Sequence, residues 1–247
     1  GPPALPAILR PPYDRGNRHG YPLLDIVSHP RRIGIGRQLG SSGYLQGLCE
    51  ICPGGRVDRG DGSLELCSFS KGVTFDEAQK ILGGSFSPEE SFAHWIAGIR
   101  ELFEEAGVLL AYDQKENLLQ LTNREEREKF LGYRELLQKG KISLSEMAQK
   151  ENFLFALDQL HYYAHWITPE ARPERFDTRF FLTRYPSGQE ASHDQKETTA
   201  GVWITPKKAL EENLKGDVIL SPPTLKTLED LSRFKTIEDI FQSLKKD

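Results

Sequence analysis

The 247-residue chain has three cysteines, one methionine and no long apolar run. Three cysteines are too few for a disulfide framework, so we expect a reducing, cytoplasmic setting. No apolar run approaches the roughly 18 residues that a membrane-spanning helix needs, so we expect no membrane partner. The 32 Lys and Arg against 36 Asp and Glu give a formal net charge of -4 without a long basic block, which argues against nucleic acid as a partner. From these exclusions we expect a soluble globular protein with the length of a typical enzyme.

Capping residues and apolar spacing divide the chain into predicted helices and strands. Ser87 offers an N-cap, Pro88 suits a first helical turn and Gly107 suits a C-terminal stop, so a long helix is expected from Pro88 to Ala106. Other helices are expected at 75–82, at 206–214, twice within the charged region 123–160, and from 222 onward. Strands are expected at 23–27, 108–112, 162–168, 175–185 and 199–205.

The end of the long predicted helix carries three acids on one face. Glu101, Glu104 and Glu105 are spaced i, i+3 and i+4, and acids at this spacing repel one another by roughly a few tenths of a kcal/mol per pair. A hard divalent cation such as Mg²⁺ or Mn²⁺ prefers oxygen ligands and would remove this repulsion. We therefore predict the three acids as metal ligands, with Arg100 fixing one carboxylate through a bidentate pair. The alternative is an ordinary solvated acidic face.

The segment 100–108 resembles part of the Nudix hydrolase signature G-x5-E-x7-R-E-U-x-E-E-x-G-U, in which U is aliphatic. Gly55 would be the opening glycine, and Asp61 stands at the position of the first glutamate. Gly55 and Arg100 are 45 positions apart where the signature has 14, so about 31 residues are inserted. Glu89 or Glu90 could therefore take the place of Asp61.

The resemblance extends over about 20–235 and is greatest to the coenzyme A diphosphatase subgroup of the Nudix family. That subgroup is also indicated by the segments 166–169, 175–181, 203–206 and 222–225. The fold implied is α/β, of the α+β type, with a mixed β-sheet sandwiched between α-helices. A single Nudix hydrolase domain is implied over 1–247, with insertions at about 62–87, inside the signature, and about 123–160. The last four residues, 244–247, do not form a peroxisomal signal.

The resemblance implies hydrolysis of a diphosphate within a nucleoside diphosphate derivative, with coenzyme A or an acyl-coenzyme A as the leading candidate. It implies Mg²⁺ or Mn²⁺ as cofactor and leaves a homodimer open. The residues implied in catalysis are Arg100, Glu101, Glu104, Glu105 and, as general base, Glu197. The residues expected to bind substrate are Gly54, Gly55, Trp166 and Arg175. Two alternatives stand beside this function: a diphosphatase for ADP-ribose, nucleotide sugars or dinucleotides, and a non-catalytic regulator that binds a ligand.

Overall fold

A computed structural model describes residues 23–29, 32–33, 54–168, 170, 175–191, 204–218 and 220–245. The strands are β1 (Leu23–His29), β2 (Arg32–Ile33), β3 (Gly54–Arg56), β4 (Ser70–Lys71), β5 (Ala111–Tyr112), β6 (Leu154–Ala156), β7 (His161–Ile167) and β8 (Arg175–Arg184). The helices are α1 (Leu64–Ser68), α2 (Phe75–Leu82), α3 (Pro88–Ala106), α4 (Arg124–Gln138), α5 (Leu144–Glu151), α6 (Pro206–Lys215), α7 (Pro222–Leu231) and α8 (Ile237–Ser243), with a short 3-10 helix η1 (Leu157–Gln159).

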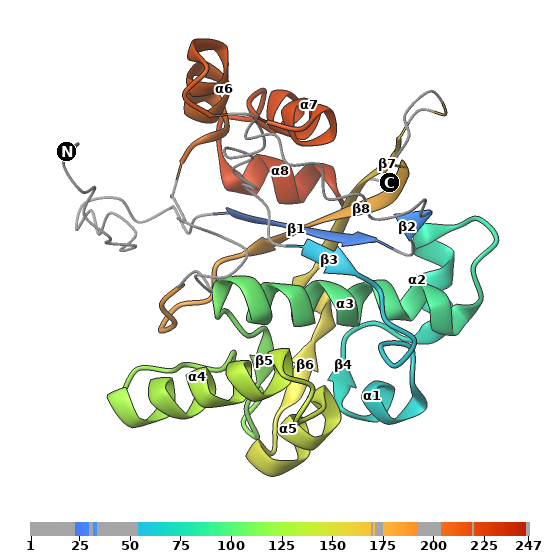
Figure 1. The fold of residues 1–247 in the computed structure, drawn as a ribbon, viewed down its shortest axis with the longest axis vertical. Coiled ribbons are helices and arrows are strands. Elements are labelled where there is room, and N and C mark those ends of the chain that lie inside the picture. Colours follow the sequence, from blue (N-terminus) through green and yellow to red (C-terminus); the bar gives the residue numbers. More distant parts are fainter. Residues whose placement is uncertain are drawn as a thin grey trace, which may run out of the picture.

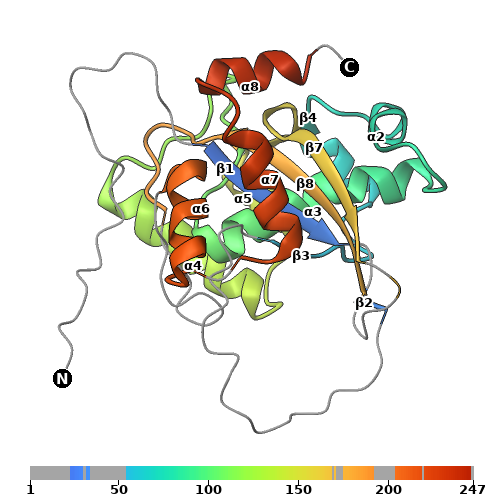
Figure 2. The ribbon, with the colours of Figure 1, turned by 90° about the horizontal axis from the view of Figure 1, so that it is seen from above.

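The described strands form two sheets with α3 between them (Figure 1). The larger sheet has the order β2-β8-β1-β3, with β7 also paired to β8; β1 and β3 are parallel, and β8 is antiparallel to β1 and β7. The smaller sheet has the order β4-β6-β5. Helices α6, α7 and α8 cover the face of the larger sheet that is turned away from α3 (Figures 1 and 2). The expected mixed sheet sandwiched between helices is confirmed.

Helix α3 begins and ends where its capping residues predict. The Ser87 hydroxyl accepts a hydrogen bond from the Glu90 amide, and the Glu90 carboxylate accepts one from the Ser87 amide. At the other end Gly107 has a φ of 67° and donates its amide to the Phe103 carbonyl, a left-handed stop that favours glycine. The Trp95 ring packs edge-on against Phe181 of β8, with the ring centroids 5.0 Å apart. These caps and this buried face fix α3 against the larger sheet.

The predicted strand 108–112 is only partly correct, because β5 covers Ala111–Tyr112 alone. Leu109 lies in a fully buried segment, and the Gln189 side chain takes the place of a neighbouring strand there. The Gln189 amide accepts from the Leu109 amide at 2.9 Å and donates to the Leu109 carbonyl at 2.8 Å. The Gln189 side chain, 80 positions further along the chain, thus satisfies the backbone amide and carbonyl of Leu109. The sequence pattern predicted a neighbouring strand as their partner.

The segments 62–87 and 123–160, expected as insertions, meet in the smaller sheet. The first contains α1, β4 and α2, and the second contains α4, α5, β6 and η1. Strand β4 pairs in parallel with β6, placing Ser70 opposite Phe155. The two predicted helices of 123–160 are present, whereas β6 and η1 were not foreseen. The predicted strand 199–205 lies largely outside the described residues. Among the residues that the structure describes, no helix is long and apolar enough to cross a bilayer.

Candidate metal and active site

The acidic side of α3 lies against β3. Gly55 on β3 has no side chain, and a Cβ placed there would lie 2.2 Å from Cδ and Oε1 of Glu101. The Glu101 carboxylate therefore occupies the space that any other residue at position 55 would fill. Glu101 is 8% exposed, so this carboxylate is largely removed from solvent.

Arg100 joins the helix to the loop that follows β3. Its Nε and Nη2 donate to the two carboxylate oxygens of Asp61 at 3.2 and 3.0 Å, a bidentate pair. Nη2 also donates to the Arg56 carbonyl at 2.5 Å. Nη1 donates to Glu101 Oε1 at 2.5 Å and lies 3.5 Å from Glu104 Oε2. The bidentate partner of Arg100 is thus Asp61, and not one of the helix acids as the sequence suggested.

The three acids considered for the first glutamate of the signature differ in their surroundings. Asp61 is 4% exposed and paired with Arg100. Glu89 and Glu90 are exposed at the start of α3, where Glu90 completes the helix cap. The Asp61 carboxylate also accepts the Asp58 amide at 2.8 Å, which closes the loop around the guanidinium.

The structure brings two of the three predicted metal ligands together. Glu101 and Glu104 both approach Nη1 of Arg100, while Glu105 is buried, with 6% exposure, one residue further along α3. Among the residues described, no three His, Cys, Asp or Glu side chains enclose a common point. The guanidinium nitrogen instead lies at the position where the two carboxylates converge.

The charges at this site do not balance. Burial raises the pKa of Glu101 to about 7, although Arg100 opposes the rise. Burial likewise raises the pKa values of Glu104 and Asp61 above their ordinary values. One guanidinium therefore serves three largely desolvated carboxyls, and each carboxylate also disfavours ionisation of its neighbours. The donors themselves suit a divalent cation, which prefers oxygen ligands and would compensate the remaining negative charge once Arg100 Nη1 no longer lies between Glu101 and Glu104.

The structure places the remaining predicted site residues in less detail, or away from the carboxylates. Gly54 begins β3, and Arg175 begins β8, although the side chain of Arg175 lies outside the described residues. Trp166 packs with Phe180 on the face of the larger sheet that is turned away from α3. Glu197 lies outside the described residues. The structure therefore does not bring Trp166 to the carboxylates.

Two side chains that contact the end of α3 were not predicted from the sequence. Arg134 and Gln138 of α4 donate to the carbonyls of Glu104 and Glu105. Both lie in a strongly charged helix whose pattern resembles a solvated surface, and their partners are about 30 positions away along the chain. No local signal identifies such a contact.

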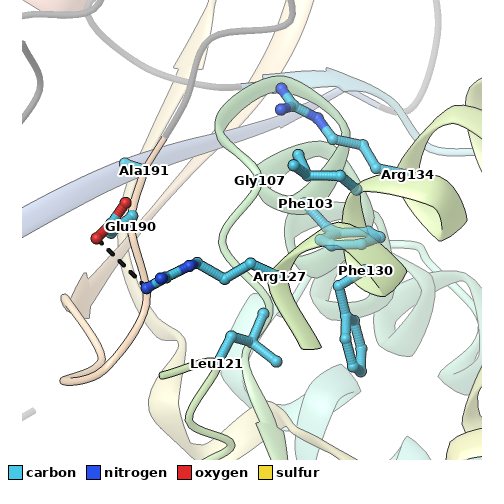
Figure 3. A pocket seen from close by; sticks show the side chains of 9 residues that line it. Phe103, Gly107, Leu121, Arg127, Phe130, Arg134, Glu190 and Ala191 are labelled. Atoms are coloured by element: carbon cyan, nitrogen blue, oxygen red, sulfur yellow. Dashed lines mark hydrogen bonds and ion pairs between the residues drawn. The ribbon is translucent and has the colours of Figure 1, made fainter. Parts of the chain in front are cut away.

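A pocket of about 140 Å³ lies beside the C-terminal end of α3 (Figure 3). Phe103, Leu121 and Phe130 form much of its wall. At its rim, Arg127 Nη1 lies 3.5 Å from Glu190 Oε1. None of the acids around Arg100 lines this pocket. Since those acids lie elsewhere, we place the candidate active site at the carboxylates and not in this pocket.

Comparisons with known proteins show the family to which the chain is similar. The model of the family described as the NUDT19 Nudix domain matches residues 67–233. Acyl-coenzyme A diphosphatase NUDT19 of Xenopus laevis is 30% identical over 167 residues, which cover 64% of this chain and 43% of that protein. The Gallus gallus protein of the same name is 26% identical over 240 residues, covering 81% and 60%. The chain thus spans about half the length of these curated relatives.

A solved structure shares the fold. The crystal structure of a Nudix hydrolase from Alicyclobacillus acidocaldarius superposes with a TM-score of 0.60, covering 90% of this chain and 96% of the other. The sequence identity is 21%, so the likeness concerns the fold alone.

Proposed function

The chain belongs to the Nudix family represented by the NUDT19 Nudix domain, and from that premise we propose that it is a metal-dependent diphosphatase. Its proposed substrates are nucleoside diphosphates linked to a further moiety, with coenzyme A and acyl-coenzyme A first among them. The observation that carries the proposal is the set of carboxyls gathered around Arg100: Asp61 and Glu101, which are buried, and Glu104, which is half-buried. The preference for coenzyme A derivatives rests on the names of the relatives.

We propose Glu101, Glu104 and Glu105 as the residues that hold Mg²⁺ or Mn²⁺. These residues would hold the cation, which would supply compensation of phosphate charge and a more acidic water molecule. Arg100 is anchored through Nε and Nη2 by Asp61 and the Arg56 carbonyl. Its Nη1 can therefore release Glu101 and Glu104 without the guanidinium losing its position. Asp61 would then fill the place of the first glutamate in the signature.

The remaining roles follow from the sequence. Glu197 is proposed to accept a proton from the attacking water, and Gly54, Gly55 and Arg175 are proposed to contact the substrate; Trp166, on the far face of the larger sheet, is not. In-line attack depends mainly on positioning and on compensation of phosphate charge. The fixed backbone of β3 and the capped helix α3 supply that positioning for Gly55 and Glu101.

Replacing Glu104 with glutamine should lower diphosphatase turnover at least about a hundredfold, because a cation contributes several kcal/mol to such a reaction. Product release from coenzyme A, acyl-coenzyme A, ADP-ribose, nucleotide sugars and dinucleotide polyphosphates is measured with Mg²⁺ or Mn²⁺, and again with a chelator. Glu125→Gln, an exposed acid on α4, is the control and should be active. A 4′-phosphopantetheine product identifies coenzyme A derivatives. Equal trace release by wild type and Glu104→Gln would support a ligand-binding regulator instead.

Replacing Gly55 with alanine should lower turnover about tenfold or more with little loss of stability. The new methyl group must displace the Glu101 carboxylate, the flexible end of a side chain, so the change falls mainly on the metal site. Gly60→Ala is the matched control in the following loop, since nothing lies within 4 Å of its added Cβ. Turnover and thermal unfolding are measured for both variants. Unchanged turnover in Gly55→Ala would contradict the placement of Glu101 in the active site.

A further inference from the structure

The last turn of α3 is held by side chains of α4. The final carbonyls of any helix lack partners within the helix, and here Gly107 satisfies only that of Phe103. Arg134 Nε donates to the Glu104 carbonyl at 2.8 Å and Nη2 donates to the Glu105 carbonyl at 2.7 Å. Gln138 Nε2 donates to the same Glu104 carbonyl at 2.8 Å. The two residues whose backbone is held are two of the proposed metal ligands.

This contact is built into the core and is not a surface pairing. Arg134 is 5% exposed, and it lies beside Phe103 and Gly107 at the end of α3 (Figure 3). A guanidinium at a helix C-terminus interacts favourably with the negative end of the helix dipole. Its rigid planar fork presents one donor to each of two successive carbonyls, a fixed geometry that the compact ammonium of a lysine lacks.

We infer that Arg134, assisted by Gln138, is a positioning residue for the metal site: it fixes the backbone from which Glu104 and Glu105 extend. The inference rests on the proposed function. Helix ends fray when their carbonyls lack partners. If the last turn of α3 frayed, the backbone of Glu104 and Glu105 would have no fixed position, and their carboxylates would not be held in place. Binding a cation would then require ordering that turn, which weakens binding. The segment 123–160 thereby acts on the metal site through a helix backbone.

The test is Mn²⁺ binding by isothermal titration calorimetry, together with the Mn²⁺ dependence of turnover. Arg134→Ala should raise the Mn²⁺ dissociation constant at least about tenfold, and the half-saturating Mn²⁺ concentration for turnover should rise by a similar factor. Arg134→Lys should be intermediate, because it keeps the charge and loses the fork. Gln138→Ala, which removes one of two donors to the Glu104 carbonyl, should raise the constant about threefold and provides the test if Arg134→Ala does not fold.

The control is Leu137→Ala, a buried apolar change on the same helix that removes no contact with α3 carbonyls. It should lower thermal stability and leave Mn²⁺ affinity near wild type. If Leu137→Ala weakens Mn²⁺ binding as much as Arg134→Ala, or if Arg134→Ala and Gln138→Ala bind like wild type, the inference is overturned. Absence of Mn²⁺ binding by the wild type overturns the proposed function, and this inference with it. Wild-type binding that is lost in Glu104→Gln and kept in the Arg134 and Gln138 variants overturns the inference alone.

Discussion

Replacing Arg100 with methionine should lower the free energy of unfolding by about 3–5 kcal/mol, the effect expected when a buried ion pair loses one partner. Methionine keeps much of the side-chain volume and removes the charge. Asp61 and Glu101, 4% and 8% exposed, would then be buried without their cation. Urea unfolding at pH 8 in the presence of a chelator measures the loss, and turnover should fall with it.

The control for this change is Arg124→Met. Arg124 pairs with Glu128 at 2.6 Å, but both side chains are largely exposed, so the loss should be at most about 1 kcal/mol. The Arg100→Met deficit should shrink toward pH 4, because burial raises the pKa of Glu101 to about 7, so this carboxyl is neutral there. An Arg100→Met deficit no larger than that of Arg124→Met would show that Arg100 is not the cation on which the buried acids depend.

The second large effect concerns how the free energy of unfolding depends on pH in the metal-free protein. Two buried groups, His94 and Glu101, should change it in opposite directions. Burial lowers the pKa of His94 to about 4 from an ordinary value of 6.5. The folded chain then binds fewer protons than the unfolded chain, so the stability from His94 is complete above pH 6.5 and is lost as the pH falls toward 4. Because one pKa unit corresponds to about 1.4 kcal/mol, the full loss is about 3 kcal/mol.

Glu101 acts in the opposite direction. Burial raises its pKa to about 7 from 4.5, so its contribution to the stability of the fold is complete below pH 4.5 and is lost as the pH rises through 7. The size is again about 3 kcal/mol. Between pH 4.5 and 6.5 the two contributions largely cancel.

Single substitutions should separate these opposed contributions. Relative to wild type, Glu101→Gln should lose about 3 kcal/mol of stability on acidification from pH 6.5 to 4.5, because the His94 contribution is no longer opposed. His94→Asn, which can keep a donor toward the Glu90 carbonyl, should gain a similar amount over the same interval. Urea unfolding midpoints across this range give both slopes. Parallel slopes in all three proteins would contradict the burial of both groups.

The long helix was predictable because its signals are local. Ser87, Pro88 and Gly107 fix its ends, and the spacing of Glu101 and Glu104 places both on one side. The partner of Arg100 was not predictable in the same way, since Asp61 lies 39 positions earlier along the chain and the sequence suggested one of the helix acids instead. Whether Asp61 meets Arg100 depends on how the loop after β3 folds over α3.

Alternation along a strand shows which side chains share a face, but not which face meets the active site. Trp166 lies with Phe180 on one face of its sheet, and Arg179 lies with Phe181 on the other. The packing of Phe181 against Trp95 shows that the second face is turned toward α3. The sequence alone therefore could not distinguish a substrate-stacking tryptophan from one on the far side.

The pairing of β4 with β6 makes two distant stretches of chain depend on one another. The amide of Phe155 donates to the Phe69 carbonyl at 2.8 Å, so excising 62–87 would leave the inner strand of a three-stranded sheet with a bare edge. Unpaired edges of this kind recruit other chains and promote aggregation. A shortened version of this protein should therefore keep both stretches, since removing 123–160 as well would leave β5 without its partner strand.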